Sequence, residues 1–314
     1  MENNGSKEII AFYNVENLLM PDPPPVHKTD PSASGLRNWD ERKYRIKLSK
    51  IAHVFQLIAD QEGVTPLLIG LCEVQGREPL EELLALTPFP NHQIVHYGSS
   101  DLRGIDVALL YDRTKLQLIS SQPLSFNFQT TDGESQPDPT RDILHCRFHC
   151  DGRNLNVFVL HLPSKREKDV NKALRTNILE QLHQVVTEYI ANGEAVIICG
   201  DFNANPDEDT VKKLLYDKDF MKVLHNPFGE LLSANKFSTY HRANGLLFDQ
   251  IILSDGFYRT GFPLKFKTAK IFSYEKLRVR DRKLAARPAK TFAGTRYLGG
   301  YSDHFPVITE FEKR

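Results

Sequence analysis

Acidic and amide side chains recur where apolar segments of this chain end. Glu73 follows the run "LLIGLC" (67–72), and Asp201 and Asn203 follow "AVIICG" (195–200). A carboxylate at the end of a buried strand is costly unless it faces a cation or a base. Glu73 taken alone fits two interpretations, a metal-facing carboxylate or an acid at an exposed strand tip.

Two further segments combine acids with histidines. Asp303 and His304 are adjacent in "YSDHFPV", which by itself is also compatible with a polar turn before a last strand. Asp249 interrupts the apolar run "LLFDQIIL" and therefore needs a buried partner, plausibly a histidine. His161 ends the run "VFVLH", where a lone histidine is more often structural than catalytic.

The types of donor atom in these segments favour one class of metal ion. Asn14 and Glu16 in "FYNVEN" lie two residues apart, so an extended chain would direct both to one side. Oxygen donors without thiolates favour Mg²⁺ or Mn²⁺ over Zn²⁺. The oxygen-bearing candidates are Asn14, Glu73, Asp201, Asn203, Asp249 and Asp303.

The segment "DFNANP" has one competing interpretation as a calcium-binding loop. Pro206 occupies the position that requires glycine, and Lys212 occupies the position that requires glutamate, which excludes that interpretation. An ordinary turn built on Asp201 and Asn203 stays open.

Hydrophobic periodicity predicts the elements that must position these residues. We expect a strand over 8–15 and a surface loop over 20–35. Asn38 and Glu41 have the spacing of a capping box, which predicts the start of a helix there, and Gly63 can end that helix. A second long helix is expected over 168–192. Many strands with few long helices favour two packed sheets over a doubly wound parallel sheet. Without a visible linker, residues 1–314 are expected to form a single domain.

Composition argues against a membrane-spanning protein and against a cysteine-based zinc site. The hydrophobic content of 40% and charged content of 25% are typical of a soluble globular chain, and no apolar run reaches the roughly 20 residues of a membrane span. No signal peptide is visible, so a cytoplasmic location is expected, with export as the alternative if a leader was removed. The cysteines lack zinc-site spacing and are expected to be buried thiols: Cys72, Cys146, Cys150 and Cys199.

The net charge is zero, but the charge is unevenly distributed. Residues 259–296 contain twelve Lys or Arg residues against two acids, Glu275 and Asp281. Such a segment suits a phosphate-bearing partner, and on charge alone it equally fits a solvated basic loop.

Eight short motifs in order give the chain a family resemblance. It resembles the endonuclease/exonuclease/phosphatase superfamily of metal-dependent phosphoesterases, which includes DNase I, and its bacterial predicted-endonuclease branch. The resemblance implies a four-layered α/β sandwich, two mixed sheets flanked by helices, with the site at one end. It spans about residues 8–311, in the motifs "NVENL", "LCEV", "RGIDVALLY", "TRDIL", "LHLPS", "GDFNANP", "FDQIIL" and "YSDHFPV".

The resemblance also implies roles for single residues. Glu73 would be the main Mg²⁺ ligand, assisted by Asn14 and, directly or through water, by Asp303. Asp201 would activate or orient the attacking water, and Asn203 would hold a phosphate oxygen. Mn²⁺ is the alternative metal.

Further roles concern the histidines and one arginine. His304 would pair with Asp249, His161 matches a second histidine of the DNase I and sphingomyelinase branches, and Arg141 matches a phosphate-contacting arginine. Two assignments stay open: His304 as base oriented by Asp249, or Asp201 as base while His304 grips phosphate.

The sequence thus predicts a Mg²⁺-dependent phosphodiesterase, an endo- or exonuclease acting on nucleic acid, with a monomer favoured. The alternatives are a phosphomonoesterase or a lipid or inositol-phosphate hydrolase of the same superfamily, and a catalytically idle nucleic-acid-binding scaffold. Glu16 departs from the family, which often has aspartate there, so its role is left open.

Overall fold

The computed structural model describes residues 6–22, 36–99, 104–126, 141–165, 169–259, 261–281, 284 and 286–314. Two six-stranded mixed sheets form its centre. The first contains, in spatial order, β13 (Leu264–Ile271), β16 (Val307–Lys313), β1 (Lys7–Leu18), β2 (Leu68–Val74), β4 (Asp106–Asp112) and β3 (His92–His96). The second contains β5 (Gln117–Leu124), β6 (Ile143–Cys150), β7 (Arg153–His161), β8 (Ala195–Asp201), β12 (Asp249–Ser254) and β9 (Leu224–His225).

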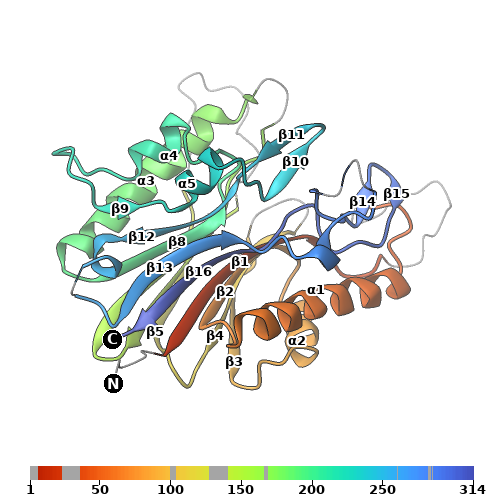
Figure 1. Ribbon diagram of the computed structural model, residues 1–314, viewed down its shortest axis with the longest axis horizontal. Helices are drawn as coiled ribbons and strands as arrows, with labels where there is room; N and C mark the ends of the chain where they lie inside the picture. Colours follow the sequence, from red (N-terminus) through yellow and green to blue (C-terminus); the bar gives the residue numbers. More distant parts are fainter. Residues whose placement is uncertain are drawn as a thin grey trace.

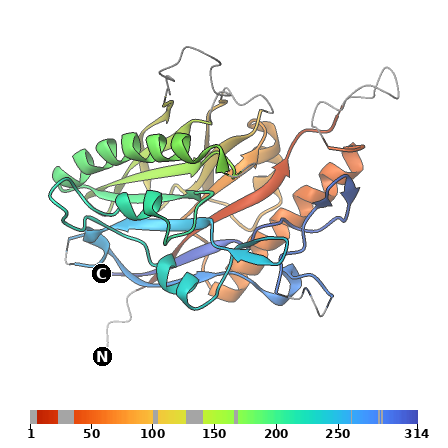
Figure 2. The same ribbon diagram turned by 90° about the horizontal axis from the view of Figure 1, so that it is seen from above.

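Helices cover the outer faces of both sheets (Figure 1). Helices α1 (Glu41–Glu62) and α2 (Glu78–Ala85) pack on the first sheet, while α3 (Lys172–Ala191) and α4 (Asp209–Lys213) pack on the second. The short helix α5 (Phe228–Ser233) lies beside the edge of the sandwich (Figure 2). The predicted four-layered α/β sandwich is confirmed.

Strand β1 shows why the central strands read as continuous apolar runs. Ile9 and Ala11 face α1, whereas Ile10 and Phe12 face the second sheet, and all four are fully buried. A strand covered on both faces has no solvent side, so it loses the alternating pattern of a half-exposed strand. All four cysteines are buried free thiols.

Some boundaries differ from the sequence expectation. The N-cap of α1 is Asp40, whose side chain accepts from Lys43 N at 2.9 Å, and not Asn38, which adopts a left-handed conformation with φ 52°. Gly63 ends the helix as predicted, with φ 71°. The second long helix begins at Lys172. Residues 23–35 of the expected loop and Lys168 lie outside the described residues.

The pairing of the strands brings their polar ends to one end of the sandwich. β1 runs parallel to β2, so Asn14 lies opposite Cys72, next to Glu73. β8 pairs with β7 and β12, which places Asp201 opposite His161 on one side and opposite Asp249 on the other. Residues from both sheets therefore meet at this end.

Among the described residues, no helix combines the length and apolar character that a membrane crossing requires. The assignment of residues 1–314 to a single domain stays a prediction.

The close pairing of β7 and β8 leads to a test at Gly200, the residue before Asp201. A Cβ atom there would lie 2.3 Å from the Leu160 carbonyl oxygen, so the Gly200→Ala variant must displace backbone. We expect it to lose about 1–3 kcal/mol of unfolding free energy, measured by urea denaturation. The control is Gly229→Ala, where a Cβ meets nothing within 4 Å. Equal stability of the two variants would contradict this account of the pairing.

Candidate active site

A bulge in β1 separates the two polar residues near its end. The register with β2 shifts between Asn14 and Leu18, and Glu16 and Asn17 take left-handed conformations with φ 52° and 57°. Such angles are uncommon outside glycine. The expectation that Asn14 and Glu16 point to one side was wrong, because the bulge breaks the alternation of the strand: Asn14 contacts the site, whereas Glu16 binds the backbone amides of Thr291 and Phe292.

Asn14 links carboxylates from the two sheets. Its Nδ2 lies 3.2 Å from Glu73 Oε1 and 3.1 Å from Asp201 Oδ2, while its Oδ1 accepts from Glu16 N at 3.0 Å. The amide nitrogen therefore donates toward both carboxylates, and the role of Asn14 as a cation ligand stays a prediction. Glu73 itself has φ 64°, and its Oε2 accepts from Asn17 N at 3.0 Å. A left-handed backbone at an acidic residue is typical of a functional position.

His161 extends the cluster from β7. Its Nε2 lies 3.8 Å from Glu73 Oε1 and 3.7 Å from Asp201 Oδ2, so the ring faces both carboxylates. Arg141 lies beside it and contacts the His161 carbonyl oxygen through Nη1 at 3.4 Å. The structure thus brings both residues to the site, and their roles toward phosphate stay predictions.

The segment after β8 forms a turn at the site. Asp201 Oδ1 accepts from Asn203 N at 2.9 Å, and Asn203 adopts φ 46° while its Nδ2 donates to the Leu162 carbonyl at 2.9 Å. The alternative of an Asx turn is therefore confirmed as the local structure. It does not exclude a role in the site, because the amide nitrogen keeps a second N–H for a ligand.

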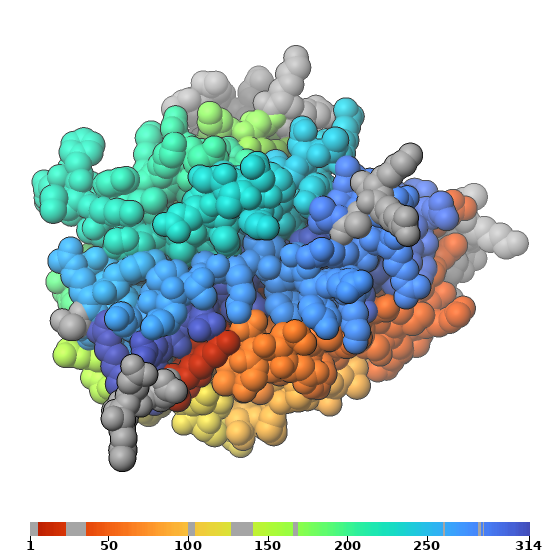
Figure 3. All heavy atoms as spheres, in the orientation of Figure 1, coloured from red at the N-terminus to blue at the C-terminus, as the bar shows by residue number. Residues whose placement is uncertain are grey.

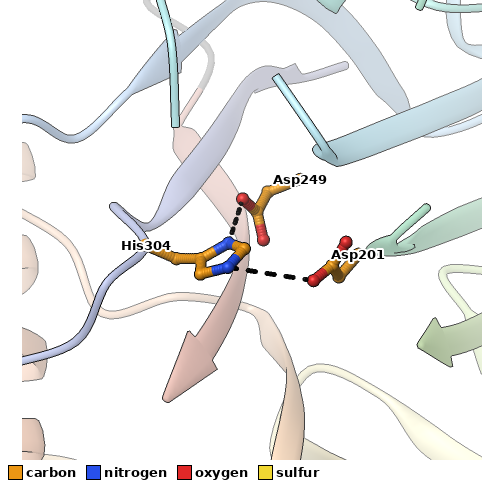
Figure 4. A group of neighbouring side chains, drawn as sticks. All are labelled: Asp201, Asp249 and His304. Carbon is orange, nitrogen blue, oxygen red and sulfur yellow. Dashed lines mark hydrogen bonds and ion pairs between the residues drawn. The ribbon is translucent and has the colours of Figure 1, made fainter. Parts of the chain in front are cut away.

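The closest acid–histidine contact joins Asp249 to His304 (Figure 4). His304 Nδ1 lies 2.7 Å from Asp249 Oδ2, which also accepts from Ser238 Oγ at 2.5 Å. The opposite ring nitrogen, Nε2, lies 3.9 Å from Asp201 Oδ2 and 3.9 Å from Asp303 Oδ1. The Asp249 carboxylate therefore holds the Nδ1–H, and Nε2 is directed toward the other acids.

Burial and charge set the protonation states of this pair. Burial opposes charging of His304, but the carboxylates of Asp249, Asp303 and Asp201 outweigh it and hold the pKa of His304 well above its usual range. Burial raises the pKa of Asp201 to about 7, although the neighbouring His304 acts in the opposite direction. At neutral pH the site accordingly pairs an imidazolium with a carboxyl group that titrates near neutrality.

Residues 9–313 match the family model described as "Endonuclease/Exonuclease/phosphatase family". The chain belongs to this family. Family members hydrolyse phosphoester bonds, so the chain is a phosphoesterase, and they generally depend on a divalent metal. A search of curated proteins gives no match.

Solved structures of the family share the fold at low sequence identity. TDP2 of D. rerio complexed with a single-strand DNA product is 16% identical, with a TM-score of 0.60, covering 98% of this chain and 100% of that one. A mannosyl-6-phosphatase of Bacteroides thetaiotaomicron is 14% identical (TM-score 0.59; coverage 97% and 99%). The human Nocturnin catalytic domain with bound sulfate is 17% identical (TM-score 0.59; coverage 98% and 95%).

The family's divalent metal fits the donor set of the site. Asp201 and Asp249 bring carboxylate oxygens within 4.8 Å of one another beside His304, and Glu73 and Asp303 add carboxylates nearby. The cationic His304 is not itself a ligand in this state. Within the described part of the chain, Asp249 Oδ1 is buried with no hydrogen-bond partner. Carboxylate-rich donors without thiolates match a hard cation such as Mg²⁺ or Mn²⁺.

Sequence reasoning missed several residues that support the site. Ser302 Oγ donates to the Asn14 carbonyl at 2.7 Å and accepts from His304 N at 3.1 Å, and Ser238 orients Asp249. Lys47 is 1% exposed on α1. The sequence could have indicated Lys47, because this lysine directly precedes Leu48 on the buried face of the helix. The two serines have no sequence pattern that distinguishes them from ordinary turn residues.

The raised pKa of Asp201 predicts how stability depends on pH in the metal-free protein. A carboxyl group with a folded pKa of about 7 and a usual value of 3.8 favours folding below its unfolded pKa, and that contribution disappears as pH rises through about 7. Asp201→Asn removes the titration. Because each pKa unit corresponds to about 1.4 kcal/mol, we expect the variant to be close to the wild type near pH 4 and to exceed it by about 4 kcal/mol at pH 8.

Thermal unfolding across this pH range measures the difference. Added Mg²⁺ should reduce the difference, because a cation bound beside Asp201 also stabilises its carboxylate charge, which the variant lacks. A variant that is less stable than the metal-free wild type at pH 8 would show that Asp201 is not under electrostatic strain.

Proposed function

We propose that this phosphoesterase is a Mg²⁺-dependent phosphodiesterase that hydrolyses nucleic acid. The observation that carries the proposal is the continuous series of contacts from Asp249 through His304 and Asp201 to Asn14 and Glu73. Each step is shorter than 4 Å. It supplies a base, a proton donor and cation ligands within one cluster.

Of the two role assignments left open, the protonation states favour Asp201 as the base. Its pKa of about 7 suits proton abstraction from water at neutral pH. His304 stays cationic because Asp249 holds its Nδ1–H, so its Nε2–H can donate to a phosphate oxygen. Asn14 Nδ2 orients the Asp201 carboxylate.

The remaining residues of the site would bind the phosphate group. Asn203 keeps an N–H for a phosphoryl oxygen, and His161 and Arg141 lie on the side of β7. Glu73 and Asp303 would hold Mg²⁺, with Mn²⁺ as a substitute. When bound, the cation supplies charge neutralisation on the phosphoryl and leaving oxygens.

An aromatic platform favours a nucleic-acid substrate. It lies beside residues 302–306, which carry Asp303 and His304 and are here called the catalytic loop. The hairpin of β10 (Thr239–His241) and β11 (Asn244–Leu246) bridges from Thr239 to His304. Tyr240 follows Thr239 in β10, and the Arg287 guanidinium lies over its ring, 5.6 Å from the ring centroid. The Phe237 ring packs edge-on against Tyr240, with 5.9 Å between the two ring centroids. Bases of single strands stack on aromatic rings and on guanidinium planes.

Phe237 of the platform packs directly on the backbone of the β10–β11 hairpin. A Cβ atom on Gly245 would lie 2.1 Å from the Phe237 ring, so the ring lies over the glycine opposite Tyr240. A small phosphate ester would not need this surface.

The basic segment 259–296 supports the proposal only in part. Lys267 pairs with Glu312, Lys270 with Glu62, and these charges lie on the edge strand β13. Lysines on an edge strand also protect it from pairing with other chains. Arg278 and Arg287 lie near the Tyr240 ring and are the part of the segment available to a substrate at the platform.

The first test measures hydrolysis of bis-p-nitrophenyl phosphate in Mg²⁺. Asp249→Asn keeps the shape of the side chain but removes the charge that orients His304, so kcat should fall about 10²–10⁴-fold. The matched control is Asp255→Asn, which changes a second Asp–His pair, with His225 at 3.1 Å. The proposal fails if the two variants lose activity equally, or if the wild type is inactive with Mg²⁺ and Mn²⁺.

The second test separates nucleic acid from small phosphate esters. Tyr240→Ala should raise KM for a single-stranded oligonucleotide about tenfold, because one stacked base is worth roughly 1–3 kcal/mol, while hydrolysis of bis-p-nitrophenyl phosphate stays the same. Tyr216→Ala, at an exposed tyrosine of the α4–β9 connection, is the control. Faster hydrolysis of sugar phosphates than of oligonucleotides, with no effect of Tyr240→Ala, would instead identify a phosphomonoesterase.

A further inference from the structure

The segment before the catalytic loop forms a closed unit, here called the β14–β15 segment (residues 289–301). It contains β14 (Phe292–Ala293) and β15 (Arg296–Tyr297) and leads directly into Ser302 and Asp303. Hydrogen bonds close its base: Tyr301 N donates to Ala289 O at 2.5 Å, and Leu298 N donates to Thr291 O at 2.8 Å. The position of this unit therefore determines where the catalytic loop begins.

Lys47 joins both ends of the segment to α1. Its Nζ lies 2.6 Å from Thr291 Oγ1 at the start of the segment and 2.7 Å from Tyr301 O at the end. Figure 3 shows the orange surface of α1 directly beside the blue surface of residues near 270–300. A buried ammonium is costly unless hydrogen bonds and opposite charge compensate it. Lys47 has both.

Glu16 holds the same end of the segment from the other side. Its Oε2 accepts from Thr291 N at 2.6 Å and its Oε1 from Phe292 N at 3.0 Å, and the side chain is buried. These contacts depend on the bulge that turns Glu16 away from Asn14. The residue that departs from the expected pattern of the family thus contacts the β14–β15 segment with both carboxylate oxygens.

Charge connects the two residues to the site. Burial lowers the pKa of Lys47 to about 8, and the carboxylates of Glu16, Asp303 and Glu73 act in the opposite direction. Lys47 is thus within electrostatic reach of the two acids that would hold the cation.

We propose that Lys47 and Glu16 are positioning residues that fix the base of the β14–β15 segment and thereby place Asp303 and His304 in the site. The inference rests on the proposed function, because it assigns Asp303 to the cation and His304 to the phosphate. Neither Lys47 nor Glu16 contacts the reacting groups in this proposal.

Trp39 provides a readout that does not depend on activity. It is the only tryptophan of the chain, it is 1% exposed, and its ring lies 6.0 Å from that of Phe292 in the β14–β15 segment. Its Nε1 donates to Leu19 O at 2.9 Å, which holds the indole at the end of β1. A displacement of the segment must change the packing of this indole.

The main test is Lys47→Met, which keeps most of the length of the side chain and removes the ammonium. We expect a red-shifted Trp39 emission with greater acrylamide quenching, and a kcat for bis-p-nitrophenyl phosphate that falls about 10–100-fold with KM within about twofold. Mn²⁺ affinity, measured by calorimetry, should weaken because Asp303 is displaced.

The direction of the change in metal affinity separates positioning from simple electrostatics. Removal of a positive charge near Glu73 and Asp303 by itself would tighten cation binding. Tighter Mn²⁺ binding with unchanged Trp39 emission would therefore overturn the proposal.

Two further variants test whether the effect comes from the contact of Lys47 with the segment or only from removal of an ammonium. Thr291→Val removes one acceptor of Lys47 while leaving the charge in place, and should change the same readouts in the same direction by a smaller amount, even if Lys47→Met does not fold. Lys115→Met removes an ammonium that contacts both Glu8 oxygens at the far end of β1, and should leave Trp39 emission and Mn²⁺ affinity unchanged. Thr291→Val behaving like Lys115→Met overturns the proposal.

The readouts also distinguish failure of this inference from failure of the proposed function. A wild type that binds Mn²⁺ but cleaves no phosphodiester contradicts the function, while Trp39 emission and Mn²⁺ affinity still test the positioning role. An active wild type whose Lys47→Met variant keeps its kcat, Trp39 emission and Mn²⁺ affinity contradicts the positioning role alone.

Discussion

The site depends on one buried carboxylate. Asp249 is the first residue of β12, inside an apolar run of the sequence, and is fully buried. Such a group is stable only where hydrogen bonds or a positive charge compensate it. Ser238 and His304 supply this compensation, the latter from 55 residues further along the chain. The need to compensate Asp249 fixes the orientation of the imidazole. That orientation directs Nε2 toward Asp201 and Asp303, so a requirement of stability also arranges the candidate catalytic groups.

Around this pair, the scaffold holds its polar groups through strained backbone rather than through long side chains. Glu16, Asn17, Glu73 and Asn203 all have left-handed φ angles, and all lie at the ends of β1, β2 and β8. The bulge in β1 lets two neighbouring polar residues serve different purposes: Asn14 connects the two sheets, and Glu16 holds the β14–β15 segment. Such strain persists because the packed sandwich on either side of these strands leaves the backbone little freedom to relax.

The shared sandwich explains why TDP2, the mannosyl-6-phosphatase and Nocturnin, which differ in name, superpose on this chain with similar TM-scores. Most of the acids and histidines lie at ends of strands of the two central sheets, whereas the platform at Tyr240 and the β14–β15 segment belong to separate two-stranded sheets. In the proposed function, the central sheets supply the reacting groups and the Tyr240 platform would contribute to substrate choice. This division is why the family identifies a phosphoesterase, while the proposal of a nucleic-acid substrate draws on Tyr240, Phe237 and Arg287.

By itself, the sequence determined the reaction class and identified most of the residues that the fold brings together at the candidate site. Buried strands read as apolar runs, so Glu73, Asp201 and Asp249 stood out as acids where no acid is expected. It could not give the bulge in β1, because left-handed angles at Glu16 and Asn17 leave no mark on composition or periodicity. Nor could it assign Lys47, Ser238 and Ser302. Their partners lie tens to hundreds of residues away along the chain, and only the packing of α1 and the two sheets brings those groups together.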